Sequence, residues 1–374
     1  MNKRLNSRWK PDFWFFTKLF VILAMCLFIV YPFYTIITKS VFSSKVEGIT
    51  LYNFKRFFTK PYYYQTLLRS MVVCFSTVLT TTLVGVPVAY LITRYNIPGK
   101  KILHIFIIMS LMSPPFIGAY SWIILLGRNG LVARALAKIG MTAPTIYGRG
   151  GIIFVFTLHL FPYIYLYTSG AMNSIDSSLE EASENLGMNK IRRIWTVTLP
   201  VILPSILAGC IMVFMTCLAD FGTPMLLGEG YTVLPVLVYN EYMSESATDP
   251  YMASALSVII VFCSLVMLSF QKLVVDKRNY TMSSLRPPQE TKLHGFKRFL
   301  ASLPIYIVVC LAFLPQIVVV CQSFIERSFS GVIKGVNGLP EVARRFRECG
   351  VTQLGTSRLE QVERCGQAGI PGPY

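Results

Sequence analysis

The chain has 374 residues, of which 53% are hydrophobic and only 14% charged, and its formal net charge is +17. Soluble domains carry about a quarter charged residues, so this composition excludes an ordinary soluble protein and indicates one that crosses a membrane several times. The basic residues are scattered through the connections between apolar runs, which argues against a nucleic-acid partner.

Seven stretches without Asp, Glu, Lys or Arg are long enough to cross about 30 Å of hydrocarbon as helices. They are residues 19–38, 70–93, 102–127, 150–175, 194–219, 250–271 and 299–325. The first follows a basic start without a small-residue cleavage site, so we predict a retained span and not a signal peptide. Since helices satisfy their own backbone groups in lipid, the sequence predicts an all-α, polytopic integral membrane bundle with about 7 transmembrane helices surrounded by membrane lipid.

The Lys and Arg residues in the connections indicate the orientation of the spans. With a cytoplasmic N-terminus, basic residues inside outnumber those outside, before the seventh span, by about two to one. The connection 176–200 is then cytoplasmic, and the connection 220–249 lies outside and carries acidic but no basic residues. That outer connection either docks a basic lobe of a binding protein or is ordinary solvated loop charge.

The connection 176–200 contains clear helix start and stop signals. Asp176, Ser177 and Ser178 are N-cap candidates followed by Leu-Glu-Glu-Ala, and acids suit the positive end of a helix. Gly187 can end that helix in a left-handed conformation, and Asn189 can cap a second helix. The sequence therefore predicts a short helix, a turn and another helix at the inner membrane surface.

The same connection carries a spaced motif. Glu181-Ala182-Ser183 is followed by three residues, Gly187, nine residues and Val197-Thr198-Leu199-Pro200. This spacing resembles the EAA loop of bacterial ATP-binding-cassette (ABC) importer permeases, EAA-x3-G-x9-I-x-L-P, from which Ser183 and Val197 depart mildly. An interfacial amphipathic helix is the alternative reading. The resemblance implies a bundle of the type I ABC importer permease kind, with the following residues coupled to a cytoplasmic ABC ATPase subunit: Glu181, Ala182, Ser183, Gly187, Val197, Leu199 and Pro200.

Two further stretches resemble permeases of the ferric-iron importer group, which is related to spermidine/putrescine, thiamine and phosphonate permeases. They read SPPFIGAYSWIILLGRNG and LADFGTPMLLGEGYTVLPVLVYNEYMSE, and the resemblance covers roughly residues 10 to 325. It implies iron import across the bacterial inner membrane by alternating access. The implied partners are the ATPase, a periplasmic or lipid-anchored substrate-binding protein, and a second permease half or copy.

No phosphate-binding loop accompanies Lys100, whose context is IPGKK. We therefore expect no enzymatic activity and no bound cofactor in this chain, with ATP used by the partner subunit. The nine cysteines form no CxxC or Cys/His cluster, so we predict no metal site and no disulfide framework.

Asp220 ends an uncharged run of membrane length, where an acid is a candidate pathway residue. The candidate pathway residues are Asp220, Phe221, Gly222, Thr223 and Pro224. The alternative, which we favour for Asp220, is that it caps a helix at Gly222-Thr223-Pro224. His104 and His159 lie inside spans and are expected to be hydrogen-bonded packing residues.

The end of the chain indicates an internal repeat. YPFYTIITKSVF at 31–42 aligns with LPQIVVVCQSFI at 314–325. We therefore divide the chain into a first six-span half (1–275, with the coupling loop at 176–200), a cytoplasmic linker (276–298) and the first span of an incomplete second half (299–325). The tail 326–374 is basic and atypical on the expected outer side, which favours a truncated or frame-shifted product.

Alternatives within the importer class are polyamine, thiamine or phosphonate import. A non-transporting fragment and a secondary transporter or channel are the alternatives from other classes. An ion-driven carrier has no need of the 181–200 spacing, so replacing Glu181 and Gly187 distinguishes it from an importer.

Overall fold

The computed structural model describes residues 13–45, 48–128, 130–141, 145–243, 249–275 and 291–325. Across these residues the regular structure is helical, apart from one isolated bridge between Tyr95 and Thr291. The chain forms two units, 1–316 and 317–374, and the second is described only in the last turns of one helix. The predicted linker is described only from residue 291, and the predicted atypical tail 326–374 lies outside the described residues.

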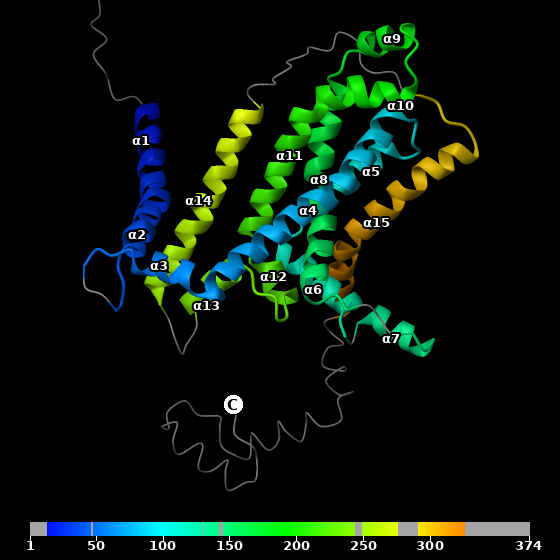
Figure 1. Ribbon diagram of the computed structural model, residues 1–374. Helices are drawn as coiled ribbons and strands as arrows, with labels where there is room; N and C mark the ends of the chain where they lie inside the picture. Colours follow the sequence, from blue (N-terminus) through cyan, green and yellow to red (C-terminus); the bar gives the residue numbers. More distant parts are fainter. Residues whose placement is uncertain are drawn as a thin grey trace, which may run out of the picture. The chain divides into compact units, whose positions relative to one another are not determined.

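Seven helical runs in this part of the chain are long and apolar enough to cross a membrane, in agreement with the predicted number, although the third, Pro115–Lys138, overlaps only the second half of the predicted span 102–127 (Figure 1). The first is a continuous run of α1 (Phe13–Met25), the π-helical turn η1 (Cys26–Val30) and α2 (Tyr31–Ser40). The other uninterrupted crossings are α4 (Pro61–Arg94), α8 (Arg149–Asn173), α11 (Leu199–Ala219), α14 (Pro250–Val275) and α15 (Phe296–Ile325). Shorter helices connect them: α3 (Tyr52–Thr59), α7 (Leu131–Lys138), α9 (Ser177–Asn185), α10 (Lys190–Arg193), α12 (Gly222–Leu227) and α13 (Leu234–Met243).

The predicted span over 102–127 is divided in the structure. The structure has two twelve-residue helices there, α5 (Lys100–Leu111) and α6 (Pro115–Leu126), with a break between them. Pro114 and Pro115 lack backbone N–H groups, and each proline disfavours a helical conformation in the residue before it. Pro114 accordingly has an extended ψ of 134°. The length of the run without charged residues indicates a membrane crossing, and the two prolines divide that crossing into two helices.

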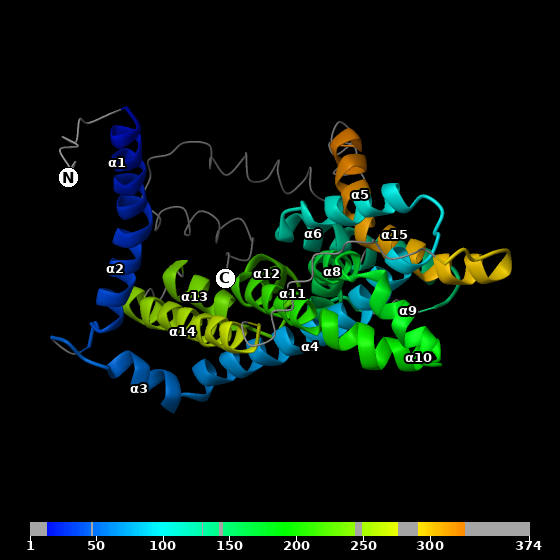
Figure 2. The same cartoon turned by 90° about the horizontal axis from the view of Figure 1, so that it is seen from above.

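The centre of the bundle is formed by α4, α8 and α11 (Figure 2). These helices approach closely because two glycines face Ile164 of α8. A Cβ atom added at Gly85 of α4 would lie 2.8 Å from the Ile164 Cβ, and one at Gly209 of α11 would lie 3.3 Å from the Tyr167 Cβ. Helix α14 lies beside α11, α2 packs on α14, and α5 lies against α8 (Figure 2).

Two π-helical turns occur at the same distance before a proline. η1 ends two residues before Pro32, and η2 (Ile194–Thr198) ends two residues before Pro200. A proline inside a helix has no N–H for the carbonyl four residues earlier, and its ring crowds that carbonyl. Widening the preceding turn relieves the clash and lets the helix continue past the proline.

Contacts between distant connections show which loops share an end of the bundle. At one end Arg56 pairs with Asp249 at 3.0 Å, and the Gly148 N–H donates to Leu227 O at 2.7 Å. At the other end the backbone near Arg94 bonds to Thr291. Successive crossings therefore alternate in direction, as predicted, with the broken pair α5–α6 acting as one crossing.

The seventh span packs against α4, α5 and α8, up to the end of the first unit. Ile305, Val309 and Ala312 of α15 are buried in a cluster with residues of α4, α5 and α8, including Ile92 and Tyr165. The sequence assigned this span to a second half. That division stays a prediction, and residues 305–312 contribute to one of the core clusters of the described bundle.

Candidate functional site

The predicted coupling segment begins with a well-capped helix. Asp176 is the N-cap of α9, and its Oδ1 accepts a hydrogen bond from the Ser178 N–H at 2.9 Å. Gly187 has a φ of +74°, the left-handed conformation that was predicted. The Gly187 N–H donates to Glu184 O at 2.8 Å and the Met188 N–H to Ser183 O at 3.2 Å. These two bonds form a Schellman motif, which ends α9 and turns the chain.

The second helix of the segment differs from the prediction. Asn189 occupies the N-cap position of α10, but its side chain makes no capping bond among the described residues. Helix α10 continues through η2 directly into α11, so it is the first part of the fifth span and not a separate helix. The π-helical turn η2 accommodates Pro200 within the continuous helix.

The turn between α9 and α10 presents apolar side chains to the surroundings. Leu186, Ile191 and Trp195 are 77%, 73% and 69% exposed. Leu186 lies in the turn after α9, and Ile191 and Trp195 lie at the start of the fifth crossing, in α10 and η2. An ion pair between Arg193 and Glu184, at 3.1 Å, joins α10 to α9.

The motif residues divide by exposure. Glu181, Ala182, Gly187 and Pro200 are exposed, whereas Ser183 is buried and Val197 and Leu199 are half-buried. The segment is anchored to the bundle by a small core formed by the ends of α8 and α11, with Leu179 packed against it. The buried core members are Met172, Ile175, Ile202 and Ile206. One face of the motif thus holds the segment on the spans, and the other is available to a partner.

The second predicted group, 220–224, surrounds a helix start. Asp220 Oδ1 accepts from the Gly222 N–H at 2.8 Å and the Thr223 N–H at 3.3 Å, and Oδ2 accepts from the Thr223 hydroxyl at 2.8 Å. Asp220 therefore caps α12, which is the alternative that the sequence favoured. Phe221 stacks on Tyr239 with 5.4 Å between ring centroids, and Gly222 and Pro224 are buried.

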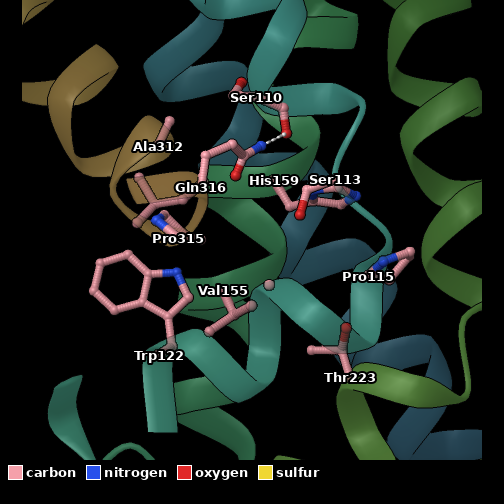
Figure 3. Close-up of a pocket in the computed structure, with 12 residues that line it drawn as sticks. Ser110, Ser113, Pro115, Trp122, Val155, His159, Thr223, Ala312, Pro315 and Gln316 are labelled. Atoms are coloured by element: carbon pink, nitrogen blue, oxygen red, sulfur yellow. Dashed lines mark hydrogen bonds between the residues drawn. The ribbon is translucent and has the colours of Figure 1, made fainter. Parts of the chain in front are cut away.

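A cavity lies at the break between α5 and α6 (Figure 3). It is a small cavity of about 20 Å³ that is partly open to the surroundings, and its polar lining includes Ser113, His159, Thr223 and Gln316. Of the five predicted pathway residues, Thr223 lines this cavity. The two histidines differ. His104 bonds to the Tyr165 hydroxyl at 2.9 Å, as expected of a packing residue, whereas His159 faces the cavity.

Gln316 and Ser113 were missed at the level of sequence. The Gln316 Nε2 donates to Met109 O at 3.2 Å and to Ser110 O at 3.4 Å in the last turn of α5, where Met109 O also accepts from the Met112 N–H at 3.1 Å. Both residues are uncharged and lie inside apolar runs, where a search for charged groups passes over them. The Ser-Pro-Pro sequence at 113–115 is the signal that could have located the cavity.

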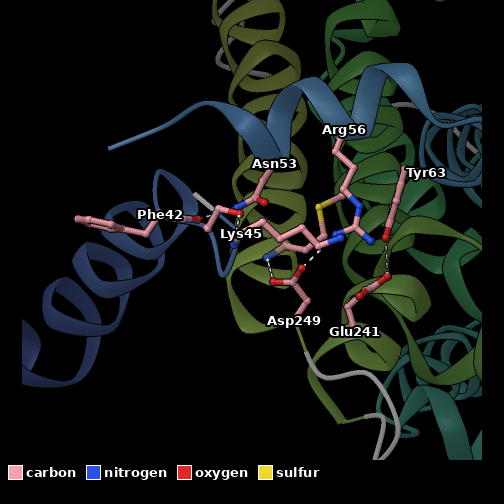
Figure 4. Close-up of polar contacts among 9 residues, drawn as sticks. Phe42, Lys45, Asn53, Arg56, Tyr63, Glu241 and Asp249 are labelled. Carbon is pink, nitrogen blue, oxygen red and sulfur yellow. Dashed lines mark hydrogen bonds and ion pairs between the residues drawn. The ribbon is translucent and has the colours of Figure 1, made fainter. Parts of the chain in front are cut away.

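Two acids of the connection 220–249, Glu241 and Asp249, have partners from the segment around α3 and the start of α4 (Figure 4). Asp249 pairs with Arg56, whose guanidinium also lies 5.3 Å from the ring centroid of Tyr63. The Tyr63 hydroxyl donates to Glu241 at 3.1 Å. Burial raises the pKa of Glu241, although the Tyr63 bond and the Arg56 charge act in the opposite direction.

Together, the alternating apolar helices, the broken third crossing and the helical turn between the fourth and fifth crossings define a multi-pass membrane permease. The chain belongs to the family described as "Binding-protein-dependent transport system inner membrane component", whose sequence profile matches residues 82–280. That match contains both the coupling segment and the cavity-lining part of α5, α6, α8 and α12.

Individual relatives agree with this family. The chain is 28% identical over 266 residues to the ferric transport system permease protein FbpB of Actinobacillus pleuropneumoniae, a match that covers 71% of this chain and 38% of the relative. It is also 28% identical over 206 residues to the molybdenum transport system permease protein ModB of Haemophilus influenzae, covering 54% of this chain and 89% of that protein. The chain spans less than half the length of the ferric transport permeases it matches.

A solved structure confirms the predicted fold. A chain from the crystal structure of a bacterial alginate ABC transporter, in complex with an alginate pentasaccharide-bound periplasmic protein, superposes with a TM-score of 0.60 at 17% identity. The superposition covers 72% of this chain and 96% of that one. The helical bundle of the type I ABC importer permease kind is therefore confirmed.

Proposed function

We propose that this chain is the membrane-spanning subunit of an ABC importer and that residues 176–200 dock a separate cytoplasmic ATPase subunit. The observation that supports this most is the exposed turn between α9 and α10 inside the family match. It combines the Glu181–Gly187 spacing, a Schellman turn and three exposed apolar side chains at one end of the bundle. This assignment places the N-terminus in the cytoplasm.

The continuous helix from α10 through η2 into α11 provides a mechanical connection. Movement of a subunit bound at α9–α10 acts directly on the fifth crossing, because no loop separates the docking segment from the span. ATP binding and hydrolysis belong to the partner. Closure of the ATPase pair then opens the pathway to the outside, where a substrate-binding protein delivers the cargo, and a second permease half or copy supplies the other ATPase contact.

We propose ferric iron as the cargo, on the similarity to ferric transport permeases over 71% of this chain. Molybdate is the second candidate, since molybdenum transport permeases match at the same identity over a shorter range. Uptake of radioactive iron and molybdate by cells with and without the chain distinguishes the two.

The docking assignment is tested by reversing one charge at each end of the bundle. Glu181→Lys should reduce the amount of ATPase subunit that co-purifies with the chain by tenfold or more, because an interfacial acid would be replaced by a base. The control is Glu229→Lys, another exposed acid at the opposite end, which pairs with Arg128 at 2.8 Å. Loss of the ATPase in the control, or its full retention in Glu181→Lys, would contradict the proposal.

A further inference from the structure

In the lining of the cavity at the α5–α6 break, hydrogen-bond acceptors remain available in excess of donors. Gln316 is the clearest case, because both of its amide functions have defined directions. Its Nε2 points at the carbonyls of Met109 and Ser110, which fixes the amide orientation, since a flipped amide would place oxygen against oxygen. Its Oε1 then faces the cavity, buried and without a partner among the described residues (Figure 3).

Thr223 adds a second acceptor. Its hydroxyl proton is engaged by Asp220 Oδ2 at 2.8 Å, so the lone pairs of the Thr223 oxygen are what remain for the cavity. The Asp220 carboxylate lies directly behind this hydroxyl. It therefore makes the oxygen a stronger acceptor and contributes negative potential without lining the cavity itself.

The other polar groups do not reverse this balance. Ser113 can donate or accept, and a neutral His159 ring has one nitrogen of each kind. Trp122 contributes an indole N–H and also the face of an aromatic ring, which attracts cations. Lysine and arginine are both missing from the described residues that line the cavity, so nothing there compensates an anion.

We propose that this cavity is a binding site within the membrane for a positively charged solute that donates hydrogen bonds. The solute is held by Gln316 Oε1, Thr223, Ser113 and the ring of Trp122. A hydrated metal cation, whose bound waters donate, and an organic ammonium share this chemistry. A bare oxyanion does not, because Gln316 and Thr223 would oppose it with lone pairs. The inference rests on the proposed transport function and selects among its cargoes, favouring iron over molybdate.

The binding test uses the purified full-length chain in lipid nanodiscs, with Trp122 as the reporter. Replacing Trp9, Trp14 and Trp195 with Phe leaves Trp122 as the single tryptophan. Manganese(II), a soluble paramagnetic hydrated cation, should quench its emission saturably. Spermidine tests the ammonium alternative, and sodium molybdate tests the oxyanion. Saturable binding of either cation, with molybdate at least tenfold weaker, is the expected result.

Two variants and a control locate the binding. Gln316→Leu should weaken cation binding about tenfold or more, as expected for losing one hydrogen bond to a charged group. Since that change also frees the Met109 and Ser110 carbonyls, Ser113→Ala provides a variant that removes a cavity oxygen alone, with a loss of about threefold. The matched control is Ser121→Ala on the same helix pair, whose hydroxyl donates to Ile117 O and does not line the cavity.

Molybdate binding as tight as either cation, cation binding unchanged in both variants, or absence of saturable cation binding would overturn the inference. These outcomes are separate from failure of the proposed function. If the chain binds the ATPase normally but does not bind a cation, the cation-binding site alone is refuted. If the chain never associates with an ATPase, the importer assignment is refuted.

Discussion

The coupling segment and the cavity show how differently two parts of one chain are encoded. The segment 176–200 is contiguous, and each of its features follows from a residue and its near neighbours: a cap at Asp176, a left-handed turn at Gly187, a widened turn before Pro200. The cavity combines side chains from α5–α6, α8, α12 and α15. Local features of this kind can be changed one at a time, whereas the cavity depends on the packing of the whole bundle.

The largest predicted effect is a loss of folding stability at the close contact between α4 and α8. Gly85→Leu should destabilise the chain by about 3 kcal/mol or more, because even a Cβ there lies 2.8 Å from Ile164 and the α4–α8 contact must open. Thermal unfolding followed by size-exclusion chromatography measures this. Gly170→Leu on α8 is the control, since an added Cβ there meets no atom within 4 Å. Equal stability of the two variants would show that the close approach is not required.

A smaller effect is expected at the turn of the coupling segment. Gly187→Val should disfavour the left-handed turn by about 1–2 kcal/mol, because a β-branched residue resists positive φ. We expect the Tm of the bundle to change little and ATPase co-purification to fall severalfold. A large drop in Tm would mean that this turn is part of the folding core, and the contrast between the two regions would fail.

The cap at the start of α9 should matter less. Asp176→Ala removes the acceptor for the Ser178 N–H and should weaken α9 by about 1 kcal/mol. Hydrogen exchange measured by mass spectrometry should accelerate in 177–185 and stay unchanged in α4 and α8. Acceleration that spreads through the spans would contradict the local character of the segment.

The smallest effect is a pH dependence of stability at Glu241, at the end of the bundle opposite the coupling segment. Because its pKa is raised in the folded chain, Glu241 holds its proton more tightly when folded than when unfolded. Above the raised pKa the buried, ionised Glu241 carboxylate therefore destabilises the folded chain. This destabilisation decreases as the pH falls and is absent below 4.5, the ordinary pKa of the group. Glu241→Gln keeps an acceptor for Tyr63 and should raise the Tm slightly at pH 8 and not at pH 4. A larger benefit at pH 4 would refute this sign.

The sequence predicted the parts of the molecule that depend on composition or on near neighbours. Charge-free length located seven crossings, and caps and glycine located α9 and its turn. The break at Pro114, by contrast, lies inside an uninterrupted apolar run, and Gln316 becomes a polar residue of interest only when α15 packs on the end of α5. The continuity of α10 with α11 was also missed, because a proline usually ends a helix and a π-helical turn that bypasses it has no simple sequence signal.

The central claim is that residues 176–200 contact the ATPase subunit. Its most direct measurement is photo-crosslinking in the assembled transporter, with p-benzoylphenylalanine at position 182 in the exposed face of α9 or at position 229 at the opposite end. The account predicts a crosslink to the ATPase from position 182 and none from position 229. A crosslink from position 229, or none from position 182 in a complex that hydrolyses ATP, would contradict it.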